Sequence, residues 1–173
     1  GHRFWVALLD SFPSLRATLP GNRLARLTYT DRYMHSPLSV ALLCEVLHAL
    51  SGEAGGDLGA GPVVVKTQDI PPNEMRPAQR IWSNWPVGKT RDAVLVAALA
   101  HRGIKVDARV YDRSKIPHAR TLELVFESGK GIRIRLDQGL GYWSAPFSNE
   151  RGIAGTFFDF SVSPVLQGEK VAE

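Results

Sequence analysis

The chain has 173 residues, of which 44% are hydrophobic and 22% are charged, a composition typical of one globular domain that buries its own core. Its formal net charge of +4 mildly favours an anionic partner over a cationic one. Cys44 is the single cysteine, which excludes an internal disulfide and a cysteine-based metal cluster and suits a reducing cytoplasm.

The N-terminal residues predict a short amphipathic helix over 4–9 that runs into a second turn before residue 19. We expect residues 1–22 to form a helical extension, residues 23–165 the main domain, and residues 166–173 a flexible tail. No run is long enough for a transmembrane helix, and no signal peptide is visible. The abrupt start at Gly1 favours a fragment of a larger protein.

Residues 24–29 alternate between apolar and polar side chains and predict a strand that ends in charged residues. Ser36 and Pro37 then predict a helix start, with serine as the N-cap and proline at the first helical position. Five glycines between residues 51 and 61 predict a flexible loop. The apolar run at 62–67 is typical of a parallel strand that is covered on both faces.

Residues 68–87 carry four prolines and two tryptophans and predict a long irregular connection. A helix with Thr90 as its N-cap follows and ends at Gly103, which is suited to a left-handed cap. Strands are expected at 104–110, at 119–126 with 132–136 as a hairpin, and at 155–162. This order predicts an α/β fold in which helices flank a mixed sheet.

His118 and Arg120 lie two residues apart at the start of a strand, so both side chains point to one side of the chain. A histidine beside a cation can hold a phosphate or attack one. The polar loop that precedes them follows a helix, a glycine and a strand. Further polar and aromatic residues occur in three other stretches, at 30–33, 138–142 and 158–160.

In these stretches the chain resembles the phospholipase D-like superfamily, most closely the phospholipase D-like C-terminal domain of MIT-domain proteins that act in abscission. The resemblance implies that His118 is a nucleophile or acid and that Arg120 binds phosphate oxygens. It also implies a wider set of ligand-binding residues. These are Arg120, Asp31, Arg32, Tyr142 and Asp159.

The chain departs from the phospholipase D pattern at two positions. Arg120 replaces a lysine, which still allows phosphate binding through two parallel hydrogen bonds. Val125 stands where the family has an aspartate, so the usual support of the histidine is missing. The chain contains only one such histidine motif, whereas a complete phospholipase D site needs two. A complete site would therefore need two protomers. We therefore interpret the motif as degenerate.

The function expected from these observations is a non-catalytic binding and assembly module that recognises phosphate-bearing ligands. Nucleic acid is favoured slightly over acidic phospholipid, because the sequence has no basic amphipathic helix. A homodimer, a cytoplasmic location and contacts with other domains of a parent protein are expected as well. The alternatives are a dimeric, metal-independent phosphodiesterase or nuclease with His118 as nucleophile, and a module that binds only proteins.

A basic groove is a further hypothesis. Arg133 and Arg135 share one face of their strand, and we expect a groove if they converge with Arg120 and with Lys66 or Arg80. A solvated sheet face explains the same alternation. The histidines show no metal-ligand spacing, so we expect neither a metal nor a cofactor.

Overall fold

The computed structural model describes residues 1–34, 36–53, 58, 63–68, 88–136, 140 and 160–165. In this part of the chain, helices precede and alternate with the first three strands, and three further strands follow. In chain order the elements are α1 (His2–Ser11), α2 (Pro13–Thr18), β1 (Leu24–Thr30), α3 (Pro37–Glu53), β2 (Val63–Gln68), α5 (Gly88–Ala100), β3 (Val106–Tyr111), the 3-10 helix η2 (Arg113–Lys115), β4 (Arg120–Phe126), β5 (Gly131–Leu136) and β6 (Phe160–Pro164).

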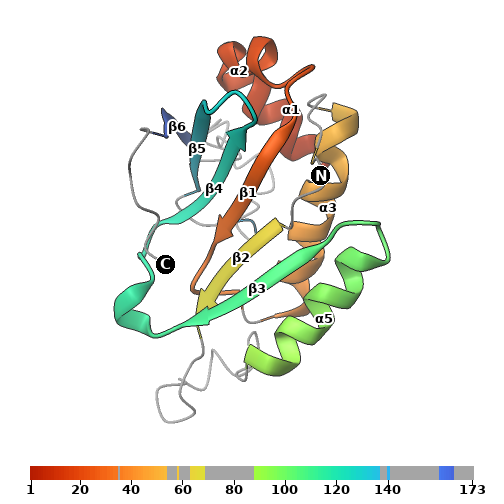
Figure 1. Cartoon of the computed structure of the whole chain (residues 1–173), viewed down its shortest axis with the longest axis vertical. Coiled ribbons are helices and arrows are strands. Elements are labelled where there is room, and N and C mark those ends of the chain that lie inside the picture. Colours follow the sequence, from red (N-terminus) through yellow and green to blue (C-terminus); the bar gives the residue numbers. More distant parts are fainter. Residues whose placement is uncertain are drawn as a thin grey trace, which may run out of the picture.

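The described strands form one six-stranded mixed sheet in the order β3-β2-β1-β4-β5-β6, which confirms the α/β class (Figure 1). β1, β2 and β3 are parallel, whereas β4, β5 and β6 each run antiparallel to their neighbours. The chain passes from β1 through α3 to β2, and through α5 to β3, in the same direction across the sheet. Because such crossovers are right-handed, both helices lie on the same face.

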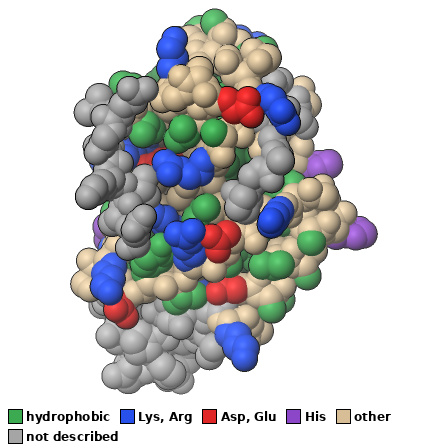
Figure 2. All heavy atoms as spheres, viewed as in Figure 1, with side chains coloured by type: hydrophobic (Ala, Val, Ile, Leu, Met, Phe, Trp, Pro, Cys, Tyr) green, Lys and Arg blue, Asp and Glu red, His purple; other side chains and the backbone are tan. Residues whose placement is uncertain are grey.

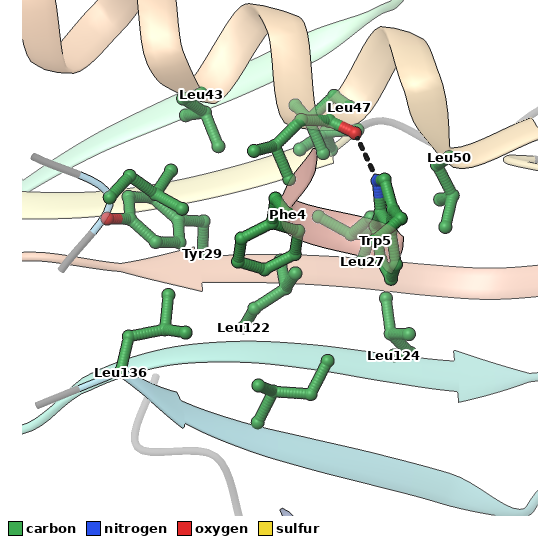
Figure 3. Packing of buried hydrophobic residues seen from close by; sticks show 14 of the residues in the cluster. Phe4, Trp5, Leu27, Tyr29, Leu43, Leu47, Leu50, Leu122, Leu124 and Leu136 are labelled. Atoms are coloured by element: carbon green, nitrogen blue, oxygen red, sulfur yellow. Dashed lines mark hydrogen bonds between the residues drawn. The ribbon is translucent and has the colours of Figure 1, made fainter. Parts of the chain in front are cut away.

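The core lies between this face of the sheet and the helices, and α1 contributes to it directly. Phe4 and Trp5 are almost fully buried and meet edge to face, with 5.2 Å between ring centroids. Figure 3 shows both rings between β1 and α3, where the indole of Trp5 donates a 2.7 Å hydrogen bond to the carbonyl oxygen of Val46. The N-terminal helix is therefore packed into the same core as the sheet.

Local signals in the sequence mark most of the element ends. The Ser36 hydroxyl accepts a 3.3 Å hydrogen bond from the Ser39 amide, which confirms it as the cap of α3. Gly103 has φ of 73° after α5, as expected of a left-handed cap. The N-cap at Thr90 is wrong, because α5 already begins at Gly88 and places Thr90 inside its first turn.

Each predicted strand is present in the described part of the chain, although β3 begins at Val106, two residues later than expected. β2 pairs in parallel with β1 on one side and with β3 on the other, and nearly all of its residues are buried. β4 and β5 form the expected hairpin, and Gly129 in its turn has φ of 80°. β6 covers the last part of the strand expected at 155–162. The loops at 54–57, 59–62 and 69–87 and the tail at 166–173 lie outside the described residues.

Candidate functional site

Asp31 follows the carboxyl end of β1 and is the centre of a buried polar cluster. Its side chain is 7% exposed and forms an ion pair with Arg120 at the start of β4, with 3.3 Å between Nε and Oδ1. The same carboxylate accepts a 2.9 Å hydrogen bond from the Tyr29 hydroxyl and a 2.8 Å hydrogen bond from the Tyr33 amide. Antiparallel pairing of β1 with β4 brings these distant residues together.

His118 joins this cluster through Tyr33. The Nε2 atom of His118 lies 3.0 Å from the Tyr33 hydroxyl oxygen, and the two rings meet edge to face at 5.5 Å. The Arg120 guanidinium lies over the same Tyr33 ring, 4.7 Å from its centroid. His118 and Arg120 are thus on one side of the chain, as their spacing predicts. His118 is exposed, whereas Arg120 is held between a buried carboxylate and an aromatic ring.

Arg32 fixes the segment that leads into His118. Its guanidinium donates hydrogen bonds to the carbonyl oxygens of Ile116 and Pro117, at 3.3 Å in the second case. These bonds tie the turn after β1 to the loop before β4. The observed contacts of Arg32 are therefore with the backbone of the protein itself.

Burial dominates the titration of Asp31. Removal of the carboxylate from water raises its pKa above the ordinary value of 3.8, and the Tyr33 amide, Arg120 and the Tyr29 hydroxyl offset only part of this rise. In the pH range above 3.8 the folded state then binds more protons than the unfolded state. By linkage, the free energy of unfolding falls as the pH rises through this range.

Asp31→Asn is expected to flatten this part of the stability curve. The amide keeps an acceptor oxygen for the tyrosine donors but does not titrate. Urea unfolding of the wild type and the variant between pH 3.5 and 7 measures the effect. We expect wild-type stability to decline relative to the variant as the pH increases. A wild-type stability that rises over this window relative to the variant would show that the pKa is lowered instead.

Two of the predicted ligand-binding residues, Tyr142 and Asp159, lie outside the described residues. Within the described ranges, no cluster of histidine, cysteine and carboxylate side chains is arranged to hold a metal ion. The described helices also include none that is long and apolar enough to cross a membrane.

The opposite face of the sheet is polar, and we call it the polar face. Strand register places two rows of side chains across all six strands on it. The first row is Arg109, Lys66, Thr30, Thr121, Arg135 and Ser161, in spatial order from β3 to β6. The second row is Asp107, Val64, Thr28, Glu123, Arg133 and Ser163.

Positive charge exceeds negative charge among the residues of these two rows. Each of the two carboxylates in the rows is paired with an arginine: Glu123 with Arg133 at 2.7 Å, and Asp107 with Arg109 at 2.8 Å. Lys66 and Arg135 add two further cations to the first row. Figure 2 looks at the molecule from the same side as Figure 1 and shows lysine and arginine side chains gathered over the middle of this surface, with acidic groups beside them.

A cavity of about 660 Å³ is hollowed into the polar face. Buried Thr28, Thr30 and Glu123 lie among the residues that line it. The loop before β4 contributes Lys115, Ile116 and Pro117, which is the segment that Arg32 ties down. The remaining lining residues come from strands β2 to β6 and from the residue before β4: Lys66, Tyr111, Ala119, Thr121, Arg133, Arg135, Ser161 and Ser163.

The cavity brings together part of the groove that the sequence suggested. Lys66, Arg133 and Arg135 do converge, whereas Arg120 points to the helix-covered face and joins Asp31 instead. Arg80 lies outside the described residues. Sequence reasoning missed Tyr111 and Lys115 as lining residues. Their signal was the end of the alternating 104–110 strand and the polar loop after it, but only the strand register shows which face they share.

Comparison with known families corrects the phospholipase D resemblance. The profile described as the DEAD/DEAH box helicase YjiV, C-terminal domain, matches residues 1–173. A search of curated proteins finds no match to the chain. The assignment to a phospholipase D-like or MIT C-terminal family is therefore wrong.

The residues behind that resemblance have a local explanation in the structure. His118 and Arg120 surround Tyr33 and Asp31 at the ends of the two central strands, an arrangement that arises from the pairing of β1 with β4. A helix, a glycine, a strand and a loop before such a pair are common to many α/β sheets. Since the helicase family profile covers the whole chain, this protein belongs to the family of C-terminal domains of the DEAD/DEAH box helicase YjiV.

Proposed function

We propose that this chain is a non-catalytic nucleic-acid-binding domain of a helicase and that its polar face contacts the phosphate backbone. The observation that carries the proposal is the first row, where Arg109, Lys66 and Arg135 cross the sheet with hydroxyl groups between them. Cations and hydroxyl groups are the side chains that most often bind phosphate oxygens in nucleic-acid complexes. Membership of a helicase family supplies the class of polymer.

Acidic phospholipid offers the same phosphate chemistry, but the polar face suits it less well. Interfacial binding needs an apolar surface that enters the acyl boundary beside the cations. The described lining of the cavity consists mainly of cations and hydroxyl groups and is concave. Nucleic acid therefore remains the favoured ligand. The cytoplasm is the proposed location, and the other domains of the helicase are the proposed partners. The expected homodimer depended on completing a phospholipase D site, and that reason no longer applies.

The salt dependence of nucleic-acid binding, measured with the chain of residues 1–173, tests the proposal. Fluorescence anisotropy with a labelled 20-nucleotide DNA or RNA should show binding at 50 mM salt that weakens steeply towards 200 mM. If about four phosphates are neutralised, log K should fall with log salt at a slope near −3 for a single strand. Anionic liposomes serve as the comparison ligand. The proposal would be overturned if the liposomes bound the protein and neither DNA nor RNA did. It would also be overturned if no ligand bound at 50 mM salt.

The alternative of a phosphodiesterase with His118 as nucleophile is tested in the same preparation. His118 lies among Tyr33 and Arg120, whereas the first row occupies the other face of the sheet. We expect no cleavage of DNA, RNA or bis-nitrophenyl phosphate in the presence of chelator. Metal-independent cleavage that disappears in His118→Ala would instead establish the enzyme and contradict the non-catalytic role.

A further inference from the structure

We infer that the ligand of the polar face is a single strand, whose phosphates follow the first row while one base stacks on Tyr111. This inference rests on the proposed function and narrows it to one form of nucleic acid and one positioning aromatic residue. Three features of the cavity carry it: the length of the row, the placement of the ring, and the shape of the walls.

The length of the first row matches a short stretch of one nucleic-acid strand. Lys66 on β2 and Arg135 on β5 are separated by β1 and β4, hence by three strand spacings, or roughly 14 Å. Along its axis a stacked strand rises about 3.4 Å per nucleotide, so this distance spans about four nucleotides. Thr30 and Thr121 lie between the two cations and present hydroxyl groups to the same phosphates.

The second row is less suited to phosphates, because Glu123 lies in its middle. Its carboxylate is almost buried in the wall of the cavity and pairs with Arg133. A phosphate placed there meets a negative charge beside the positive one, and the two largely cancel. Between Lys66 and Arg135 the first row holds only Thr30 and Thr121, so the strand is expected to follow this part of the row and to depend more on Lys66 and Arg135 than on Arg133.

Tyr111 stands at the β3 end of the cavity and is oriented by Lys66. The Lys66 ammonium lies over its ring, 5.7 Å from the centroid. A half-buried ring that is fixed in this way is a suitable platform for a base. A nucleotide stacked there has its own phosphate within reach of Lys66, so ring and cation act on the same nucleotide.

The walls of the cavity favour a single strand over a duplex. The loop of Lys115, Ile116 and Pro117 lines one end and is anchored by Arg32, while Ser161 and Ser163 of β6 line the other. A duplex is a convex rod with its bases enclosed. It can touch the cations at the rim, but it cannot bring a base to Tyr111 or a phosphate to the hydroxyl groups within the cavity.

The test compares a labelled 12-nucleotide single strand with the duplex of the same sequence, using wild type, Tyr111→Ala and Tyr111→Phe. We expect the wild type to prefer the single strand by at least tenfold. Tyr111→Ala should weaken single-strand binding by about tenfold, in line with the loss of one stacked base, and leave duplex binding unchanged. Tyr111→Phe keeps the ring and should retain most of the affinity, which separates stacking from any contribution of the tyrosine hydroxyl.

Each outcome is informative. Equal or tighter binding of the duplex, or a Tyr111→Ala variant with unchanged single-strand affinity, would overturn the inference while leaving nucleic-acid binding in place. Equal losses of duplex and single-strand binding in Tyr111→Ala would assign the ring a structural role and would also overturn it. Binding of neither polymer would overturn the proposed function itself.

Discussion

Replacement of Trp5 by alanine is expected to lower the free energy of unfolding by about 4 kcal/mol, the usual cost of removing a large buried aromatic side chain. The Trp5 side chain is fully buried between the sheet and α3, so its loss leaves a cavity that the surrounding helices and strands can fill only in part. The carbonyl oxygen of Val46 also loses its indole donor. Urea denaturation followed by circular dichroism measures the change.

Two control variants separate these contributions. Trp5→Phe keeps most of the aromatic volume and removes the hydrogen bond, so about 1–2 kcal/mol is expected. Val6→Ala alters a neighbouring residue of α1 that is 38% exposed and should change the free energy by less than about 0.5 kcal/mol. If Trp5→Ala proved as mild as Val6→Ala, α1 would be a detachable extension rather than part of the core.

Asp31→Ala is expected to lower the free energy of unfolding by about 3 kcal/mol, because three donors lose one buried acceptor. The Tyr29 hydroxyl and the Tyr33 amide lose their hydrogen bonds, and the half-buried Arg120 guanidinium loses its counter-charge. Arg120 lies over the ring of Tyr33, and Tyr33 contacts His118, so the start of β4 should become more mobile. Denaturant unfolding measures stability, and amide hydrogen exchange at the start of β4 measures the local effect.

Asp112→Ala is the matched control for that prediction. Asp112 precedes the 3-10 helix, is 80% exposed, and pairs with Lys115 at 3.8 Å. Removing an exposed ion pair of this kind should cost no more than about 0.5 kcal/mol. Equal effects of the two substitutions would show that the cluster around Asp31 adds nothing beyond a surface ion pair.

The elements of the fold were largely predictable because local chemistry determines them. Ser36 and Pro37 begin α3, Gly103 ends the turn after α5, and alternation marks the hairpin strands. The order of the strands in the sheet could not be predicted in this way. Nothing local shows that β1 lies between β2 and β4, because that placement depends on packing between residues about 90 positions apart.

The candidate site was only partly predictable for the same reason. The spacing of His118 and Arg120 predicted their common side, but their partners Asp31 and Tyr33 come from another strand. Similarly, alternation showed that Arg133 and Arg135 share a face, yet Lys66 joins them only through the register of four strands. The phospholipase D resemblance came from the order of short segments, which many α/β sheets share and which does not specify a family.

The most direct test of the account is a comparison of two double variants that remove equal charge. Lys66→Ala with Arg135→Ala removes the two cations that flank the centre of the first row, whereas Lys105→Ala with Arg3→Ala removes one lysine and one arginine from exposed positions elsewhere. Single-strand affinity at 100 mM salt is measured for both, after circular dichroism confirms folding. We expect the affinity to fall at least tenfold in the first variant, because two phosphate contacts are lost, and less than threefold in the second. Equal losses in the two variants would show that net charge alone attracts the polymer, and would contradict a binding site on the polar face.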